Sequence, residues 1–281
     1  MSVYVLMPVF NRLAMTQSML ECLRAQQADE PLTLIVIDDG SSDGTGDFLR
    51  AQADVTVLQG DGSLWWGGGI DLGVRHVLAT ASADDWVLFV NNDTRIDRGF
   101  VQALLATARQ HAPAAVGSTI RDIQPPHRRL SVGPLIDPWR LRVTDAIDDP
   151  AKREELAGDV IPVDALSGRG VLYPVPALRA VRGMRPRWLP HYLADYELAL
   201  RVRSAGWRLL VSSSAVVYSN EEYGSAFRGS SLRERFFSVR SPAYLPARIS
   251  FWWSASSLMQ RATFPLRAAA CTLISACRRK A

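Results

Sequence analysis

Three polar residues, Asn91, Asn92 and Asp93, directly follow an apolar run from Trp86 to Val90. Five apolar or aromatic residues in succession predict a strand that is buried on both faces. In open α/β sheets ligands bind at the carboxyl ends of the strands, which is where these two amides and one carboxylate would lie. Magnesium is commonly held by one or two carboxylates together with substrate phosphates. The stretch therefore predicts a divalent cation that carries a phosphate ester, the alternative being a polar turn after a core strand.

A carboxylate that could act as a base begins the run of residues 195–206. This run predicts a helix, because Leu198 and Val202 are spaced as one apolar stripe and Gly206 falls just past its end. Asp195 would lie at the helix N-terminus, where the helix dipole favours the ionised carboxylate. Such a residue can accept a proton at neutral pH. The alternative is that Asp195 only caps the helix.

Three consecutive glycines, Gly67 to Gly69, begin a further predicted helix. Glycine lets a backbone approach a ligand closely and leaves amides free at a helix start, so we expect a ligand contact here. The alternative is a flexible turn with two packed tryptophans, Trp65 and Trp66. The stretch matches neither common phosphate-loop pattern, because no Gly-x-Gly-x-x-Gly follows a strand directly and no Lys-Ser/Thr follows the glycines.

The elements that must position these residues alternate between strands and helices up to Ile120. The order β-α-β-α-β-α-β-α-β implies a mostly parallel sheet covered by helices on both faces. Later segments are shorter and more polar. We expect further strands over residues 3–7 (ended by Pro8), 32–37, 55–58, 115–120, 160–167, 171–173, 208–211 and 216–218, and helices over residues 16–28 (capped by Thr16), 46–53, 99–111 and 176–181.

The composition is that of a globular protein, with 281 residues, 48% of them hydrophobic and 21% charged. The three cysteines, Cys22, Cys271 and Cys277, show no metal-like spacing. A reducing compartment is therefore expected, and a disulfide framework is not. The N-terminus lacks a basic region and a small-residue cleavage site, so it indicates a first strand rather than a signal peptide.

The net charge of +4 is unevenly distributed along the chain. Residues 224–281 hold ten Lys or Arg and one acid, Glu234, whereas the preceding residues carry more acids than bases. Such a tail favours an anionic partner, either membrane lipid or a polyanionic substrate, and no recognition motif points to nucleic acid. No stretch reaches the ~18 apolar residues of a spanning helix. We expect a helix that lies in the membrane interface, the alternative being a helix packed on the protein's own core.

Four segments, in this order and at these separations, resemble the family 2 glycosyltransferases, which have the GT-A nucleotide-sugar fold. They are residues 5–11 (Val-Leu-Met-Pro-Val-Phe-Asn), 35–45 (Ile-Val-Ile-Asp-Asp-Gly-Ser-Ser-Asp-Gly-Thr), 89–93 (Phe-Val-Asn-Asn-Asp) and 195–201 (Asp-Tyr-Glu-Leu-Ala-Leu-Arg). The resemblance covers roughly residues 1–220. It implies a Rossmann-like GT-A domain with a nucleotide-sugar-binding half at 1–120 and an acceptor-binding half at 121–225. A basic, aromatic helical tail follows at 226–281.

The resemblance also implies roles for individual residues. Asp93 matches the last acid of the family's Asp-x-Asp motif, which binds Mg²⁺ or Mn²⁺ under the diphosphate. Asp195 matches the Asp of the family's Glu-Asp pair, the general base that deprotonates the acceptor hydroxyl. Contacts with the nucleotide or the donor sugar are implied for Pro8, Phe10, Asn11, Asp39 (on the base), Gly67, Gly68, Asp71 and Asn92.

The chain departs from the family pattern at several positions. Asn91 stands where the first acid of the motif would be, and Ala194 replaces the Glu of the Glu-Asp pair. Glu197 replaces the second Asp, which leaves Asp195 and Glu197 as alternative bases; residues two apart on a helix do not share a face. We favour Asp195, at the start of the helix. The His that the family often places after the late strand is absent from residues 217–223.

The resemblance implies an inverting glycosyltransferase, which we expect to move a sugar from a UDP- or dTDP-type donor to a hydroxyl of a glycan or lipid-linked acceptor in surface polysaccharide synthesis. It would be cytoplasmic, at the inner face of the cell membrane. The segment from Trp65 to Gly69 suggests a rhamnosyl donor. The alternative is a scaffold protein that binds a nucleotide-sugar with weak or no turnover, which Asn91 supports. A sugar-nucleotide pyrophosphorylase is disfavoured, because the first loop lacks a glycine-rich, basic turn for a triphosphate.

Overall fold

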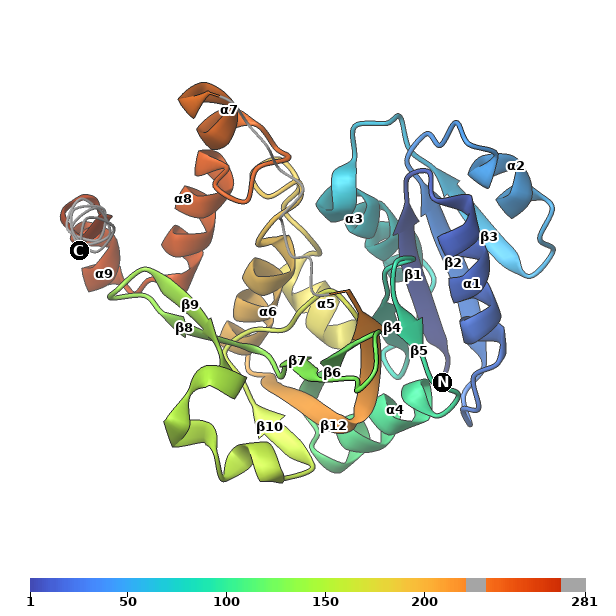
Figure 1. Ribbon diagram of the computed structural model, residues 1–281, viewed down its shortest axis with the longest axis horizontal. Helices are drawn as coiled ribbons and strands as arrows, with labels where there is room; N and C mark the ends of the chain where they lie inside the picture. Colours follow the sequence, from blue (N-terminus) through green and yellow to red (C-terminus); the bar gives the residue numbers. More distant parts are fainter. Residues whose placement is uncertain (221–230, 269–281) are drawn as a thin grey trace.

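The first half of the chain is built of parallel strands joined by helices. The strands are β1 (Val3–Val9), β2 (Leu32–Asp38), β3 (Val55–Gln59) and β4 (Trp86–Phe89), and the helices are α1 (Leu13–Arg24), α2 (Thr45–Arg50) and α3 (Trp65–Leu78). In the computed structural model, which describes residues 1–220 and 231–268, β4 pairs with β1, β1 with β2 and β2 with β3, all in parallel (Figure 1). The turns that follow β1, β2 and β4 therefore meet at one edge of the sheet.

The second half adds strands of both directions. Strand β11 (Val171–Pro174) lies antiparallel between β4 and β6 (Ala114–Asp122), and β12 (Arg208–Ser219) runs parallel to β6. Strands β5 (Arg95–Ile96), β7 (Arg129–Ser131) and β10 (Val160–Pro162) pair antiparallel with β12, β6 and β12. The expected α/β fold is confirmed, but the sheet is mixed beyond β4, because β11 runs antiparallel to both of its neighbours.

The remaining elements lie around this sheet. Strands β8 (Pro134–Asp137) and β9 (Arg142–Asp145) form a separate hairpin, which three short 3₁₀ turns follow, Ala146–Asp148, Pro150–Lys152 and Glu155–Ala157. The other helices described are α4 (Phe100–Gln110), α5 (Val175–Val181), α6 (Ala194–Ser204), α7 (Leu232–Phe237), α8 (Leu245–Ala255) and α9 (Leu258–Ala262). In residues 1–220 and 231–268, no helix has the length and apolarity needed to cross a membrane.

Two hydrophobic clusters cover the two faces of the sheet. One includes buried residues of α3, α5, α6 and α8, and the other includes buried residues of α1 and α4. Strand β4 contributes to both, with Val87 and Phe89 in the first cluster and Trp86 and Leu88 in the second. The prediction of a central strand buried on both faces is confirmed, and it fixes where the polar residues 91–93 must emerge.

Several expected boundaries are wrong for tertiary reasons. Strand β1 continues through Pro8 because beyond Leu6 it pairs with β2 alone, a position where proline is tolerated. Helix α1 begins at Leu13, so Thr16 is not its cap; instead the Leu13 amide donates to Asp43 Oδ2 at 3.0 Å. The two short strands expected within residues 208–218 are one strand, β12, with an irregularity between Ser212 and Val216. The expected strand at 160–167 is limited to β10.

The described part of the tail packs on the protein's own core along one face of α8, and its contact with a membrane stays a prediction. Helix α8 packs against α6 and buries Ala247, Phe251 and Trp252, so one face belongs to the protein's own core. The opposite side exposes Ile249 and Trp253. The last basic residues of the predicted tail, at 278–280, lie outside the described residues.

Candidate active site

The turns after β1, β2 and β4 are tied together by their own side chains. The Asn11 amide donates to Ser41 Oγ at 2.8 Å, and Asn11 Oδ1 accepts a hydrogen bond from the Ser42 amide at 2.9 Å. Arg12 Nη1 lies 2.8 Å from Asp93 Oδ2 in an ion pair. Residues that are distant in sequence are thus held in one group at the carboxyl edge of the parallel strands, as the Asp93 prediction requires.

The residues predicted to bind the nucleotide base have unequal freedom to do so. Phe10 has 56% of its surface exposed, so its ring is available to a ligand, and Pro8 is partly buried in β1. Asn11 uses its side-chain oxygen to hold the turn after β2. The Asp39 carboxylate accepts hydrogen bonds from the amides of Gly62 (2.8 Å), Leu64 (3.2 Å) and Trp65 (3.0 Å). Its contact with a base stays a prediction, because the loop before α3 already uses both oxygens.

The glycines at the start of α3 approach the protein itself. The Gly67 amide donates to the Pro190 carbonyl at 2.7 Å, and the Gly68 amide donates to the Leu64 carbonyl at 3.0 Å. A Cβ atom on Gly67 would lie 2.5 Å from the Leu189 carbonyl oxygen. The expectation that these two amides are free for a ligand is therefore wrong. Glycine is required there because the segment 189–190 passes too close for a side chain.

Asp71 and Asn92, two further predicted donor contacts, are buried and bonded within the protein. Asp71 accepts a hydrogen bond from the Met184 amide at 3.1 Å and pairs with Arg75 at 3.0 Å. Burial raises the pKa of Asp71 above its ordinary value, and the charge of Arg75 opposes this. Asn92 Nδ2 donates to Thr16 Oγ1 at 3.0 Å. These bonds join α3 to the segment after α5 and the turn after β4 to α1, so both residues support the edge on which the site lies.

The predicted metal ligand Asp93 is an exposed carboxylate at the end of β4. No group of three or more His, Cys, Asp or Glu side chains that could hold a metal occurs in residues 1–220 and 231–268. The Asn91 side-chain oxygen accepts a hydrogen bond from Trp66 Nε1 at 2.9 Å. A single carboxylate at the end of β4 still fits a Mg²⁺ ion that takes its other ligands from phosphates and water. Asp93 would have to exchange its Arg12 partner for the metal.

The candidate base Asp195 lies in the first turn of α6. Its Oδ2 accepts a hydrogen bond from the Gly168 amide at 2.9 Å, and its Oδ1 accepts one from the Tyr196 amide at 2.9 Å. Burial raises the pKa of Asp195, whereas these backbone hydrogen bonds and the charge of Arg169 lower it. The first effect is the largest, so the carboxylate is a better proton acceptor than an ordinary aspartate.

Glu197, the alternative base, is part of a buried ion-pair cluster. It is 1% exposed and lies 3.1 Å from Arg185 and 2.9 Å from Arg201, and it accepts a hydrogen bond from Ser254 at 3.0 Å. This cluster joins α6 to the segment before it and to α8. A carboxylate held in this way has a structural role, which leaves Asp195 as the candidate base.

The sequence pattern does not single out Arg169, which lies in the turn at 167–170. This turn contacts Asp195 directly and the turn that holds Asp93 through Trp66. The Gly168 amide is bonded to Asp195, and a Cβ atom on Gly168 would lie 2.2 Å from the Trp66 ring. The Trp66 ring nitrogen is in turn bonded to Asn91. Burial lowers the pKa of Arg169, and the negative charges of Asp93 and Asp195 oppose this. An arginine between two glycines at a strand-to-strand turn is the only signal for this residue in the sequence.

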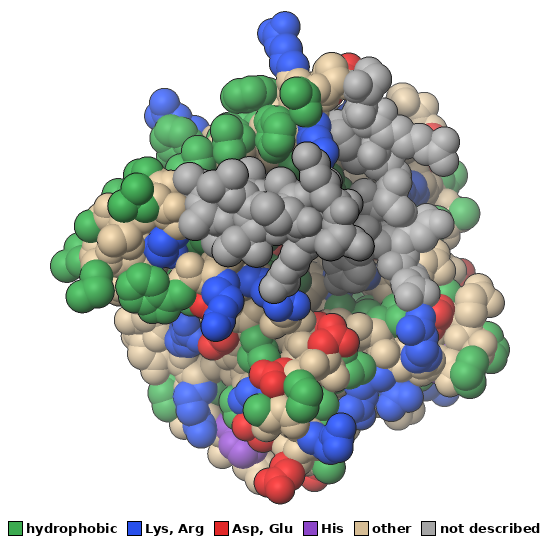
Figure 2. Space-filling model, turned by 60° about the vertical axis from the view of Figure 1, so that its left-hand side comes forward, with side chains coloured by type: hydrophobic (Ala, Val, Ile, Leu, Met, Phe, Trp, Pro, Cys, Tyr) green, Lys and Arg blue, Asp and Glu red, His purple; other side chains and the backbone are tan. Residues whose placement is uncertain are grey.

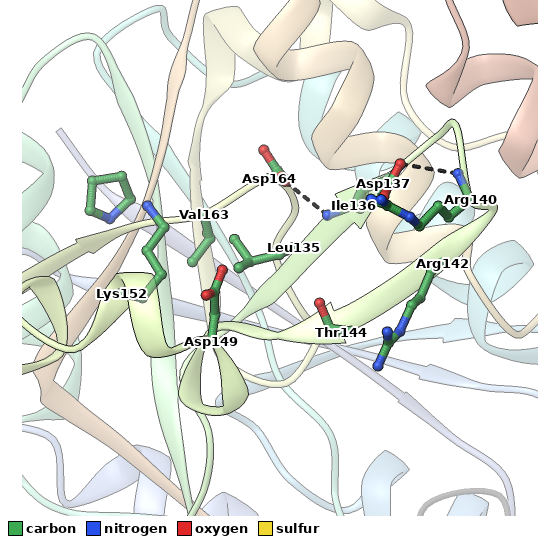
Figure 3. Close-up of a pocket in the computed structure, with 11 residues that line it drawn as sticks. Leu135, Ile136, Asp137, Arg140, Arg142, Thr144, Asp149, Lys152, Val163 and Asp164 are labelled. Carbon is green, nitrogen blue, oxygen red and sulfur yellow. Dashed lines mark hydrogen bonds and ion pairs between the residues drawn. The ribbon is translucent and has the colours of Figure 1, made fainter.

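A hollow of about 590 Å³ lies apart from this group, beside the β8–β9 hairpin. Figure 3 shows Asp137 bonded to Arg140 and Asp164 bonded to the Ile136 amide, and Arg142 on β9. Asp164 also pairs with Arg203. Charges of both signs neutralise one another here, and none of the residues predicted for the site lines this hollow.

The sequence of the chain is similar to a known protein family and to proteins of mycobacteria. Residues 4–159 match the family model described as Glycosyl transferase family 2. The chain is 26% identical over 251 residues to N-acetylglucosaminyl-diphospho-decaprenol L-rhamnosyltransferase of Mycobacterium tuberculosis, covering 81% of this chain and 78% of that protein. It is 30% identical over 219 residues to an uncharacterized protein of the same organism, covering 77% of this chain and 73% of that one.

Solved structures share the fold at low sequence identity. GalNAc-T7 with UDP, GalNAc and Mn²⁺ aligns with a TM-score of 0.63 and 11% identity, over 80% of this chain and 45% of that one. This chain thus spans less than half of GalNAc-T7. S. aureus TarS with UDP-GlcNAc aligns with a TM-score of 0.57 and 18% identity, over 85% of this chain and 64% of that one. The sheet with its edge of acidic turns thus has the fold of the GT-A glycosyltransferases. The chain belongs to glycosyltransferase family 2.

Proposed function

We propose that this glycosyltransferase moves a sugar from a UDP- or dTDP-type donor to a hydroxyl of a lipid-linked or glycan acceptor in surface polysaccharide synthesis, with inversion. The observation that carries the proposal is the turn at 167–170. It hydrogen-bonds Asp195 and packs on Trp66, whose ring nitrogen bonds Asn91 beside Asp93. This arrangement supports a base for the acceptor and a carboxylate for the donor phosphates within one site.

The transfer would proceed in one displacement. The acceptor hydroxyl loses its proton to the Asp195 carboxylate as its oxygen bonds to the anomeric carbon of the donor sugar. The bond between that carbon and the diphosphate oxygen breaks on the opposite side, and its electron pair leaves with the nucleoside diphosphate. Asp93 would hold Mg²⁺ or Mn²⁺, which neutralises charge on the diphosphate when bound. The Mn²⁺-containing neighbour GalNAc-T7 supports a divalent metal as cofactor.

The donor and acceptor classes are drawn from the rhamnosyltransferase relative. Its name specifies an L-rhamnosyl group and an acceptor of N-acetylglucosamine on decaprenyl diphosphate. We therefore propose a deoxyhexosyl donor and a sugar linked to a polyprenyl diphosphate as acceptor. The segment from Trp65 to Gly69, which suggested a rhamnosyl donor, supports the same choice at the donor end.

A lipid-linked acceptor calls for a contact with the membrane, which we propose for the tail. Figure 2 shows hydrophobic side chains beside Lys and Arg on the side of the molecule that carries α7–α9. Trp253 is 51% exposed and Leu258 is 82% exposed, and the Arg261 guanidinium lies 5.4 Å from the Trp253 ring centroid. Aromatic and basic side chains together favour the interface of an anionic membrane. The protein would then act at the cytoplasmic face of the cell membrane.

Vesicles test this membrane contact. The double variant Trp253→Ser, Leu258→Ser should co-sediment less with vesicles that contain phosphatidylglycerol than the unaltered protein does. Met15→Ser is the matched control, because Met15 is exposed on α1, away from the tail. Equal sedimentation of all three proteins would remove the membrane contact from the proposal.

Calorimetric titration with UDP, dTDP and GDP, each with and without Mn²⁺, tests the donor. Binding of one nucleotide with a requirement for metal would establish the donor class and support Asp93 as a ligand. Binding of a nucleotide without turnover of any sugar donor would favour the scaffold alternative. Binding of none of the three would overturn the proposed donor.

A further inference from the structure

The turn at 167–170 is fixed on every side. The Gly170 amide donates to the Phe89 carbonyl at 3.0 Å, at the end of β4, and Ser118 Oγ donates to the Arg169 carbonyl at 2.8 Å. The Gly168 amide donates to Asp195 at 2.9 Å. The backbone on both sides of Arg169 is thereby bonded to β4, β6 and α6 at once. The residue cannot change place without breaking one of these links.

The Arg169 side chain lies in the same acidic surroundings as the predicted catalytic groups. Its Nη1 donates to Ser219 Oγ at 2.6 Å, at the last residue of β12. Asp93 and Asp195 both act on its charge. The guanidinium is partly buried, so its positive charge is less screened by water than that of a surface arginine.

The segment from Asn91 to Asp93 has one negative charge fewer than the family's Asp-x-Asp motif, because Asn91 stands where that motif has its first acid. A metal held by Asp93 alone is bound less tightly than a metal held by two carboxylates, so it neutralises the donor diphosphate less completely at a given metal concentration. The planar guanidinium of arginine matches a phosphate group with two parallel hydrogen bonds, and it keeps its charge at every relevant pH. A fixed cation that faces the departing diphosphate also stabilises the charge that grows there during transfer.

We propose that Arg169 binds the diphosphate of the nucleotide-sugar donor, as a protein cation beside the single carboxylate Asp93. This inference rests on the proposed function, and it adds a donor-binding residue that the acidic motif does not contain. Ser219 anchors the guanidinium, and the turn at 167–170 couples its position to that of the base Asp195. The sites for the leaving group and for the proton are thus built on neighbouring residues of one turn.

Calorimetric titration of the full chain with UDP and dTDP, and with UMP and dTMP, tests this inference. Each nucleotide is measured in Mg²⁺ and in EDTA with Arg169→Met, Arg169→Lys and the control Arg142→Met, an exposed arginine on β9. We expect Arg169→Met to weaken binding of the diphosphate by about tenfold to a hundredfold, from the strength of hydrogen bonds to charged groups. The monophosphate should be affected much less, Arg169→Lys should lie between, and Arg142→Met should match the unaltered protein.

The outcomes separate the two hypotheses. If the unaltered protein binds no nucleoside diphosphate, the proposed function itself fails. If it binds but Arg169→Met binds equally well, or loses mono- and diphosphate to the same extent, Arg169 does not hold the diphosphate. Unchanged nucleotide binding with a shifted pH profile of transfer would assign Arg169 to Asp195 alone and overturn the inference. Should Arg169→Met fail to fold, Ser219→Ala, which removes the anchor, is expected to weaken diphosphate binding selectively, and an unselective effect would refute it.

Discussion

Replacement of Asp195 by Asn tests the assignment of the base. Asn has the size of Asp but no carboxylate that could take the proton of the acceptor hydroxyl. A positioned general base contributes about 10²–10⁴-fold to rate, so we expect kcat to fall by that factor. The hydrogen bonds of Asp195 run to the amides of Gly168 and Tyr196 and to no residue predicted to bind the donor. The dissociation constant of the donor should therefore change by less than about threefold.

The same variant should remain folded, because two effects of opposite sign act on its stability. With Asn in place of Asp195, one of the two backbone amides loses its acceptor, at a cost of about 1–3 kcal/mol. Burial raises the pKa of Asp195, so above that pKa the folded protein carries an unfavourable buried charge that Asn removes. This penalty is absent below the ordinary carboxyl pKa and grows as pH rises toward the raised pKa, so it is present at pH 7. We expect the melting temperature to move by less than about 5 °C.

Three measurements on Asp195→Asn and the unaltered protein test whether Asp195 is the base. Sugar transfer is followed by chromatography of the released nucleotide, donor binding by calorimetry, and unfolding by circular dichroism. In the unaltered protein, kcat should fall toward acid pH with a midpoint above the ordinary aspartate pKa, because only the ionised Asp195 accepts a proton. Full transfer activity in Asp195→Asn would refute the assignment. Equal losses of donor affinity and of transfer would instead give Asp195 a role in binding.

Three other variants test the surroundings of the base and the donor. Glu197→Gln should lower the melting temperature by about 5–10 °C, because it leaves the buried Arg201 without its ion-pair partner. The kcat per folded molecule should not change. A large loss of kcat without a change in melting temperature would show that Glu197 is the base. Gly168→Ala should lower the free energy of unfolding in urea by about 1–3 kcal/mol and reduce transfer, since its Cβ atom would clash with the Trp66 ring. An unchanged free energy of unfolding would show that the turn can shift to make room for the methyl group. Asn91→Asp should increase the effect of Mn²⁺ on donor affinity in calorimetry, because it adds a carboxylate ligand beside Asp93. An unchanged effect of Mn²⁺ would show that this turn does not bind the metal.

The local sequence pattern is sufficient to predict the strand and the helix that hold the candidate site residues. The run from Trp86 to Val90 has no polar residue, which predicts a strand buried on both faces, and the polar residues after such a strand emerge at the sheet edge. The apolar stripe of residues 195–206 likewise predicts α6 and places Asp195 in its first turn. These inferences need only the periodicity of strands and helices, which neighbouring residues determine.

Contacts between different elements of the fold decided the roles of the individual polar residues on these elements. Asp195 and Glu197 are two residues apart and chemically alike, and their different partners, the Gly168 amide for Asp195 and Ser254 of α8 for Glu197, separate their roles. The glycines of α3 looked like a ligand loop, but the carbonyl that crowds Gly67 comes from residue 189. The importance of Arg169 depends on Asp93 and Asp195, which precede and follow it on separate elements. Sequence periodicity determines which face of an element is buried, whereas the partner of a polar side chain is set by how those elements pack.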